Sequence, residues 1–182
     1  MLRSIKFVTA NQGKLREAQQ ILGIQIESAS VGHLEELQTI FVEELIRHKA
    51  QEAYNKLKAP LIVEDTGLAF LAWKGLPGAL IRWFEDTVGN EGIIKMMSGE
   101  TDRRAVAQCY IALHDGKEIK IAKGELAGTI ADAVRGENGF GWDKIFIPDG
   151  HSRTFGEMGA EEKNSFSHRR RAFENLRTII KP

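Results

Sequence analysis

The chain has 182 residues, 42% of them hydrophobic, and its 25 basic residues balance 25 acidic ones. This length and apolar content suit one domain over residues 1–182 with a sizeable core. A neutral charge balance gives no global field that would attract nucleic acid or an anionic membrane, so we expect neither as a partner. The single cysteine, Cys109, excludes an internal disulfide. Because no apolar run approaches the roughly 18 residues of a membrane span, we expect a cytoplasmic protein.

The first third of the chain alternates between strand and helix patterns. Residues 5–9 form a β-prone run, and a helical apolar pattern begins near Lys14 after a polar link. A second helical pattern covers residues 43–58, and it leads into a short, buried-looking strand over residues 61–63. This order predicts a strand, a tight loop, a helix, a second helix and a second strand.

The remainder of the chain adds antiparallel strands. Two β-prone runs, 105–114 and 117–126, flank Asp115 and Gly116, which is the strongest hairpin signal in the sequence. The other expected elements are a turn at 75–78, a short helix at 90–97, a strand at 145–147 and a helix from about Ser167, with Phe173, Leu176 and Ile180 on its buried face. The predicted fold class is therefore mixed α/β.

A first candidate site is TANQGK, residues 9–14, between a strand and a helix. The N-terminus of a helix offers backbone N–H groups and a positive dipole end to a phosphate, and Lys14 adds a mobile charge. The P-loop pattern GxxxxGK[ST] is not present. Taken alone, the segment is more often an ordinary helix cap, and an anion site is the alternative.

A second candidate is EDTG, residues 64–67, where Glu64 and Asp65 are expected to end an apolar strand. Carboxylates there can hold Mg²⁺ or accept a proton from water, although a solvated acidic turn is the more frequent structure. The glutamates that could supply a further metal oxygen are Glu35, Glu36, Glu43 and Glu44. Any one of these is more often an exposed helix charge.

A third candidate is GFGWD, residues 139–143, followed later by KNSFSHRRRA, residues 163–172. If the first segment is extended, Phe140 and Trp142 point to the same side and can hold a flat base, with core packing as the alternative. The basic run of the second segment could grip a nucleic-acid backbone, begin a solvated helix or close over a small anion. Together with the first two candidates, these segments describe a nucleotide site.

Six motifs carry a resemblance to a known family: TANQGK at 9–14, VEDTGL at 63–68, GLPG at 75–78, GFGWD at 139–143, TFGEM at 154–158, and EKN with SHR within 162–169. In this order they resemble the inosine triphosphate pyrophosphatase family, from Thr9 to about Ala172. The resemblance implies an elongated, curved mixed sheet flanked by helices, two lobes with a nucleotide cleft between them, and a homodimer. It also implies Mg²⁺-dependent hydrolysis of ITP, dITP and XTP to a nucleoside monophosphate and pyrophosphate, which cleanses the nucleotide pool.

The resemblance assigns roles to single residues. Asp65 would bind metal and accept the proton of the attacking water, and Glu36 would be a further metal ligand. The substrate-binding residues it implies are Thr9, Asn11, Lys14 and Lys49 at the triphosphate, Thr66 against the substrate, Phe140, Gly141, Trp142 and Asp143 in the base pocket, Lys163 at the nucleotide, and His168 and Arg169 at the base edge. Arg170 and Arg171 are expected on the exposed face of the last helix.

Two other functions stay open. The basic run and the two aromatic residues at 140 and 142 could belong to a module that binds single-stranded nucleic acid. A nucleotide hydrolase with a different base specificity would also need the same parts.

Overall fold

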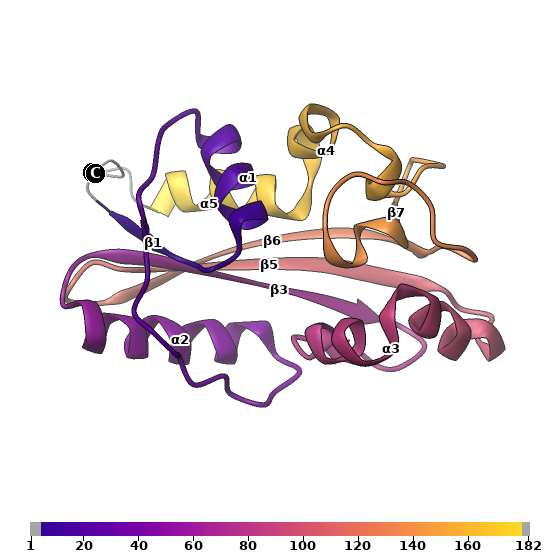
Figure 1. Cartoon of the computed structure of the whole chain (residues 1–182), viewed down its shortest axis with the longest axis horizontal. Helices are drawn as coiled ribbons and strands as arrows, with labels where there is room; N and C mark the ends of the chain where they lie inside the picture. The colour runs from indigo at the N-terminus through magenta and orange to yellow at the C-terminus, as the bar shows by residue number, and fades with distance from the viewer. Residues whose placement is uncertain (1–4, 180–182) are drawn as a thin grey trace.

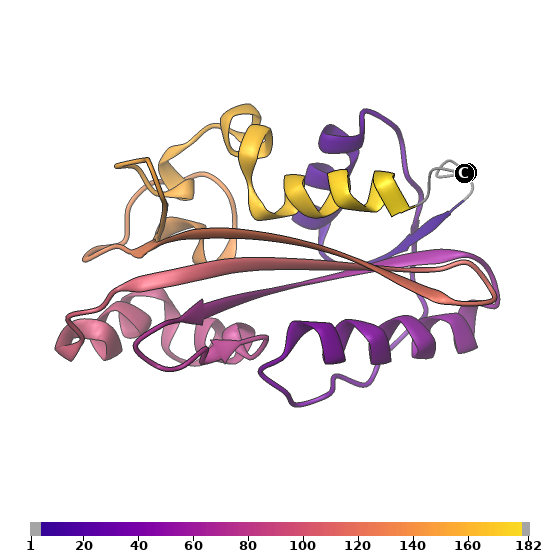
Figure 2. The ribbon, with the colours of Figure 1, turned by 180° about the vertical axis from the view of Figure 1, so that it is seen from behind.

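The computed structural model describes residues 5–179 and has one elongated sheet of seven strands with helices on both faces (Figure 1). Three long strands run along its length: β3 (Leu61–Phe70), β5 (Arg104–His114) and β6 (Ile119–Ile130). One face carries α1 (Gln12–Leu22), α4 (Ala160–Phe166) and α5 (His168–Ile179), and the other carries α2 (Val42–Leu57) and α3 (Ile81–Met96) (Figures 1 and 2). The expected mixed α/β class is confirmed.

The sheet combines parallel and antiparallel pairs. Its order is β2 (Ser28–Ala29), β1 (Lys6–Val8), β3, β5, β6 and β7 (Phe146–Pro148), and β4 (Pro77–Gly78) also pairs with β3. The β2–β1 and β1–β3 pairs are parallel, and all others are antiparallel. The predicted hairpin is confirmed, but its loop is longer than expected: His114 pairs with Ile119, so residues 115–118, and not Asp115 and Gly116 alone, connect the two strands.

The expectation that the strand beginning at Leu61 ends at Glu64 and Asp65 is wrong. β3 continues to Phe70, because β5 pairs with it along its whole length. On its other edge, β1 pairs with β3 only as far as Ile62, and β4 begins to pair at Leu68. Residues 63–67 therefore have no strand on that edge, and two acidic residues can occupy the middle of a central strand.

The expected helix at 90–97 is too short. α3 begins at Ile81 and contains a kink at Gly89, whose φ of 67° lies in the left-handed region that favours glycine. Only Ile81 and Ile93 are buried along this helix, so its apolar pattern is weak in the sequence. Weak periodicity explains why the first half of α3 was not predicted.

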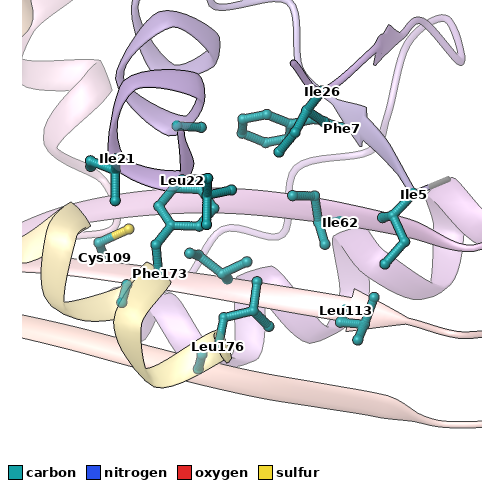
Figure 3. Packing of buried hydrophobic residues seen from close by; sticks show 14 residues of the cluster. Ile5, Phe7, Ile21, Leu22, Ile26, Ile62, Cys109, Leu113, Phe173 and Leu176 are labelled. Carbon is teal, nitrogen blue, oxygen red and sulfur yellow. The ribbon is translucent and has the colours of Figure 1, made fainter. Parts of the chain in front are cut away.

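Three clusters of buried hydrophobic residues form the core. The first packs α1 and α5 on the sheet and includes Phe7, Ile62 and Phe173 (Figure 3). The second gathers α3, Trp142 and the far ends of the long strands, and the third lies under α2. The predicted burial of Phe173 and Leu176 is confirmed, whereas Ile180 lies outside the described residues.

Candidate functional site

A cleft of about 1130 Å³ opens where β3 has no strand on one edge. It is bordered by the β1–α1 loop, residues 28–38, β3, the start of α3, residues 140–143 and the start of α5. The predicted site residues that line it are Thr9, Asn11, Lys14, Glu36, Lys49, Asp65, Thr66, Phe140, Gly141, Trp142, Asp143, His168 and Arg169. Lys163 lies behind the wall and contacts Asp143. Residues far apart in the sequence thus meet in one place.

The β1–α1 loop is an ordinary helix cap that also faces the cleft. The Asn11 side chain accepts a hydrogen bond from the backbone N–H of Lys14 at 3.1 Å, and the Thr9 hydroxyl accepts one from the N–H of Asn11 at 3.1 Å. An N-cap asparagine is among the best for beginning a helix. Because the cap holds the loop still, the N-terminus of α1 stays directed at the cleft.

Two lysines surround Asp65 in the cleft. Lys49 Nζ donates to its carboxylate at 2.8 Å, and Lys14 Nζ contacts it at 3.3 Å. Burial disfavours the charged carboxylate, but the two ammonium groups outweigh burial and hold the pKa of Asp65 well below its usual range. Burial also opposes the charge on Lys14, yet Asp65 and Glu64 raise the pKa of that lysine. Asp65 and Lys14 are therefore both ionised at neutral pH.

Glu36 lies next to this cluster. Its Oε1 is 3.9 Å from Lys49 Nζ, so Lys49 lies near the carboxylates of both Glu36 and Asp65. Within residues 5–179 no three histidine, cysteine, aspartate or glutamate side chains gather as a metal site. Two hard carboxylates beside an open cleft nevertheless fit Mg²⁺, which commonly takes one or two protein carboxylates and fills its other positions with water and phosphate.

The other glutamates of the sequence cluster lie in different places. Glu35 also lines the cleft, whereas Glu43 and Glu44 line a second hollow of about 1130 Å³ beside α2. Glu43 pairs with Arg47, and Glu44 accepts a hydrogen bond from the hydroxyl of Thr39. The second hollow contains none of the predicted site residues.

The expected extended arrangement of residues 140–142 is wrong. Gly141, with φ of 60°, begins a 3₁₀ turn that runs to Lys144, so the two aromatic rings do not alternate along a strand. Trp142 is buried against Phe146 with ring centroids 5.7 Å apart, while Phe140 is only half-buried. The Phe140 ring is therefore the more accessible of the two aromatic surfaces.

A buried network of charges supports the wall beside this turn. Lys163 Nζ donates to Asp143 at 2.6 Å and to Glu17 at 2.8 Å. Arg169 pairs with Glu17 and, through two nitrogens at 2.8 and 3.0 Å, with Glu64. Since every charge in the network has a partner of opposite sign, the desolvation cost of burying these groups is offset.

Arg169 keeps donors for a ligand despite these ion pairs. A guanidinium has five N–H groups, and three hydrogen bonds to Glu17 and Glu64 use three of them. The other two have no acceptor among the described residues.

His168, next to Arg169 in the chain, is also buried. Burial together with the charge of Arg169 holds the pKa of the His168 imidazole well below the usual value. His168 is therefore neutral, and its Nδ1 has no partner within residues 5–179.

The basic run 168–171 does not form one basic surface. Arg169 is buried, Arg170 pairs with Glu174, and exposed Arg171 donates to the backbone carbonyl of Glu125. The burial of Trp142 also removes one of the two aromatic surfaces that a single-stranded nucleic acid would need for stacking. The structure therefore gives no support to the nucleic-acid alternative.

The charged cleft residues of α3, Arg82 and Glu85, were not predicted. They are three residues apart, a spacing that places both on one side of a helix. That signal was hidden because the first half of α3 was not recognised as helical. Glu17 was also missed, although it lies three residues after Lys14 on α1.

Glu85 gives a pH-dependent prediction. Burial raises the pKa of its carboxyl to about 7 from a usual 4.5, so the folded state binds a proton more tightly than the unfolded state. The stability of the wild-type protein should then fall as pH rises from about 4.5 to 7 through this group. Glu85→Gln removes this titration. Its free energy of unfolding, taken relative to that of wild type, should therefore be about 1–2 kcal/mol higher at pH 8 than at pH 4.5, after allowance for solvent screening.

Urea unfolding of both proteins at the two pH values measures this difference. Glu91→Gln, an exposed change on the same helix, is the matched control: it keeps Glu85, so its stability should change with pH as that of wild type does. An equal pH dependence in all three proteins would show that Glu85 titrates normally.

Fold and cleft together define a mixed α/β protein whose charged cleft lies at the open edge of a central strand. The sequence model of the Ham1 family matches residues 5–179, and the chain belongs to this family. It is 44% identical to an inosine triphosphate pyrophosphatase of Yarrowia lipolytica over 97% of this chain and 95% of that protein. It is 42% identical to a dITP/XTP pyrophosphatase of Methanopyrus kandleri over 94% of this chain and 93% of that one.

Solved structures agree with these sequence comparisons. A HAM1 protein from Coxiella burnetii superposes with a TM-score of 0.84 at 32% identity, covering 97% of each chain. The Staphylococcus aureus Ham1 protein gives a TM-score of 0.83 at 30% identity, again over 97% of each chain. The family resemblance predicted from the sequence motifs is confirmed.

Proposed function

We propose that this protein hydrolyses the deaminated purine nucleoside triphosphates ITP, dITP and XTP to a nucleoside monophosphate and pyrophosphate. The observation that carries the proposal is the cleft itself. One part of it holds Lys14 and Lys49 around Asp65, and an adjoining part holds Phe140 and Arg169. The names of the similar proteins of Yarrowia lipolytica and Methanopyrus kandleri point to the same substrates.

The lysines at the phosphate end have a double use. A triphosphate entering the cleft offers more negative charge than Asp65 alone, so Lys14 and Lys49 can turn their ammonium groups toward its oxygens, with Thr9, Asn11 and Thr66 as neutral hydrogen-bonding groups. When the lysines move away, the influence that keeps the pKa of Asp65 low is weakened. Asp65 then becomes a better acceptor for the proton of an attacking water.

The base end can select by hydrogen bonding. A 6-oxo purine presents an acceptor where adenine presents an amino group, so the two remaining N–H groups of Arg169 match the former. Glu17 and Glu64 hold that guanidinium in one orientation. Phe140 offers a face against which the base can stack. The 3₁₀ turn that contains Gly141, Trp142 and Asp143 shapes the pocket. His168 adds a neutral ring nitrogen.

Mg²⁺ is the metal that the site fits best. Glu36 and Asp65 would hold it through oxygen, and when bound it would neutralise charge on the phosphates. Lys163 would act from behind the wall by holding Asp143.

The assembly is proposed to be a homodimer of single-domain chains in the cytoplasm, without nucleic-acid or membrane partners. Exposed hydrophobic side chains such as Phe41, 63% exposed, support an interface with a second copy. No helix within residues 5–179 has the length and apolar character needed to cross a membrane.

A substrate panel tests the function. Wild-type protein is incubated with ITP, dITP, XTP, GTP, ATP and CTP in Mg²⁺, and products are separated by anion-exchange chromatography. We expect monophosphate and pyrophosphate from the first three, and loss of activity in EDTA. Diphosphate and orthophosphate as primary products, or undiminished turnover in EDTA, would contradict the proposal. Faster cleavage of CTP or ATP would favour a hydrolase of different base specificity.

A further inference from the structure

The carboxyl group of Glu85 lies in an unusual position at the cleft. α3 borders the cleft opposite α1 and α5, and Glu85 is among its lining residues together with Arg82. Its Oε1 atom is buried and has no hydrogen-bond partner within the described residues. A buried acceptor without a partner destabilises a protein, so its presence in a cleft wall suggests that a ligand supplies the missing donor.

Glu85 lies against the turn that carries Phe140. A Cβ atom built on Gly141 would be 2.5 Å from Glu85 Oε1, so the carboxyl occupies the space that a side chain there would fill. From the same helix, Asn90 Nδ2 donates to the Gly141 carbonyl at 3.0 Å, while its own Oδ1 is buried without a partner among residues 5–179. α3 thus places two buried acceptor oxygens beside the turn.

The charge at this position disfavours a phosphate, since the ionised form of the Glu85 carboxyl repels an anion. Lys14 and Lys49 are the cationic groups that contact Asp65, and they mark where phosphates would lie. The nucleoside part of the substrate, by contrast, has hydroxyl and ring N–H donors, and its base is expected beside Phe140. An oxygen that lacks a donor fits that part of the ligand.

We propose that Glu85 is a substrate-positioning residue that binds a hydrogen-bond donor of the nucleoside, either a sugar hydroxyl or a ring N–H of the base. This inference rests on the proposed function and extends it, because it adds a contact between α3 and the nucleoside part of the substrate. Glu85 touches no bond that is broken, so it should affect how tightly the nucleotide is held more than how fast it reacts.

The test compares Glu85→Leu, which removes both oxygens, with Glu85→Gln, which keeps an acceptor. For ITP we expect Glu85→Leu to raise KM about tenfold with kcat within about twofold, and Glu85→Gln to recover most of the loss. Glu91→Gln, which removes an exposed charge from the same helix, should match wild type. Circular dichroism and urea unfolding confirm that each variant is folded.

One substrate analogue distinguishes the two donors. If a sugar hydroxyl is bound, the Glu85→Leu penalty should disappear with 2′,3′-dideoxy-ITP; if a ring N–H is bound, the penalty should persist. A Glu85→Leu variant with wild-type KM for every substrate would overturn the inference while leaving the proposed function intact. If wild type hydrolyses none of the panel, the proposed function fails. Calorimetric binding of inosine monophosphate to wild type and to Glu85→Leu then tests the Glu85 contact separately. A wild-type affinity in the variant, or no binding to either protein, overturns the proposed contact.

Discussion

Asp65→Asn should lower the turnover of ITP by roughly 10²-fold or more, the usual scale for losing a positioned base. Asn keeps the size of the side chain but cannot accept the proton of the attacking water, and it offers a metal only one neutral oxygen. Nucleotide binding should persist, because Lys14 and Lys49 lose one of their charged partners and can still contact phosphate. Steady-state kinetics and calorimetric nucleotide binding measure the two effects.

The same substitution has a consequence for stability. Asp65 has a pKa below its usual value in the folded state, so its carboxylate stabilises the fold above the unfolded pKa of about 3.9, and this contribution is lost as pH falls toward the folded pKa. Asp65→Asn should therefore lower Tm at pH 7, with a smaller difference in acid.

Asp132→Asn, an exposed change of the same kind, is the control and should leave both turnover and Tm unchanged. Normal turnover in Asp65→Asn would mean that another residue activates the water. A variant that is unfolded at the assay temperature would show that Asp65 is structural.

Arg169→Ala is expected to have the largest effect on stability. It removes one of two cationic partners from each of two buried carboxylates: Glu64 keeps only Lys14, at 3.5 Å, and Glu17 keeps only Lys163. Removing one partner of a buried ion pair costs about 3–5 kcal/mol. Urea unfolding measures this loss. Arg170→Ala and Arg171→Ala remove the same charge from neighbouring positions and should stay within about 0.5 kcal/mol of wild type.

Selectivity provides a separate measurement on the same variants. If Arg169 donates to the 6-oxo group, Arg169→Ala should cost about 2–3 kcal/mol in kcat/KM for ITP and barely affect ATP, so selectivity shrinks. Arg169→Lys is the second variant if the alanine protein does not fold, because lysine keeps the charge but loses the planar fork. Equal losses for ITP and ATP in all three alanine variants would indicate general attraction of polyphosphates instead of base recognition.

Local signals in the sequence predicted the parts of the fold that depend on near neighbours. Asp115 and Gly116 specify a hairpin because their backbone preferences match a tight turn, and the N-terminus of α1 follows from a capping residue beside an apolar pattern. Phe173 and Leu176 identified the buried face of α5 through their spacing alone. These features need no knowledge of distant residues.

The sequence by itself also identified many of the cleft residues, because motifs record the type of chemistry that each position offers, although Arg82 and Glu85 of α3 were missed. What only the tertiary structure decided is how those residues pair. Arg169 pairs with Glu64, which is 105 residues away in the sequence, and with Glu17, which is 152 residues away. β3 continues past Glu64 and Asp65 because the neighbouring strand β5 pairs with it there. Glu85 shows its missing partner only once α3 lies against Gly141. The physical reason is that burial and ion pairing depend on three-dimensional distance, whereas patterns of propensity extend over a few residues.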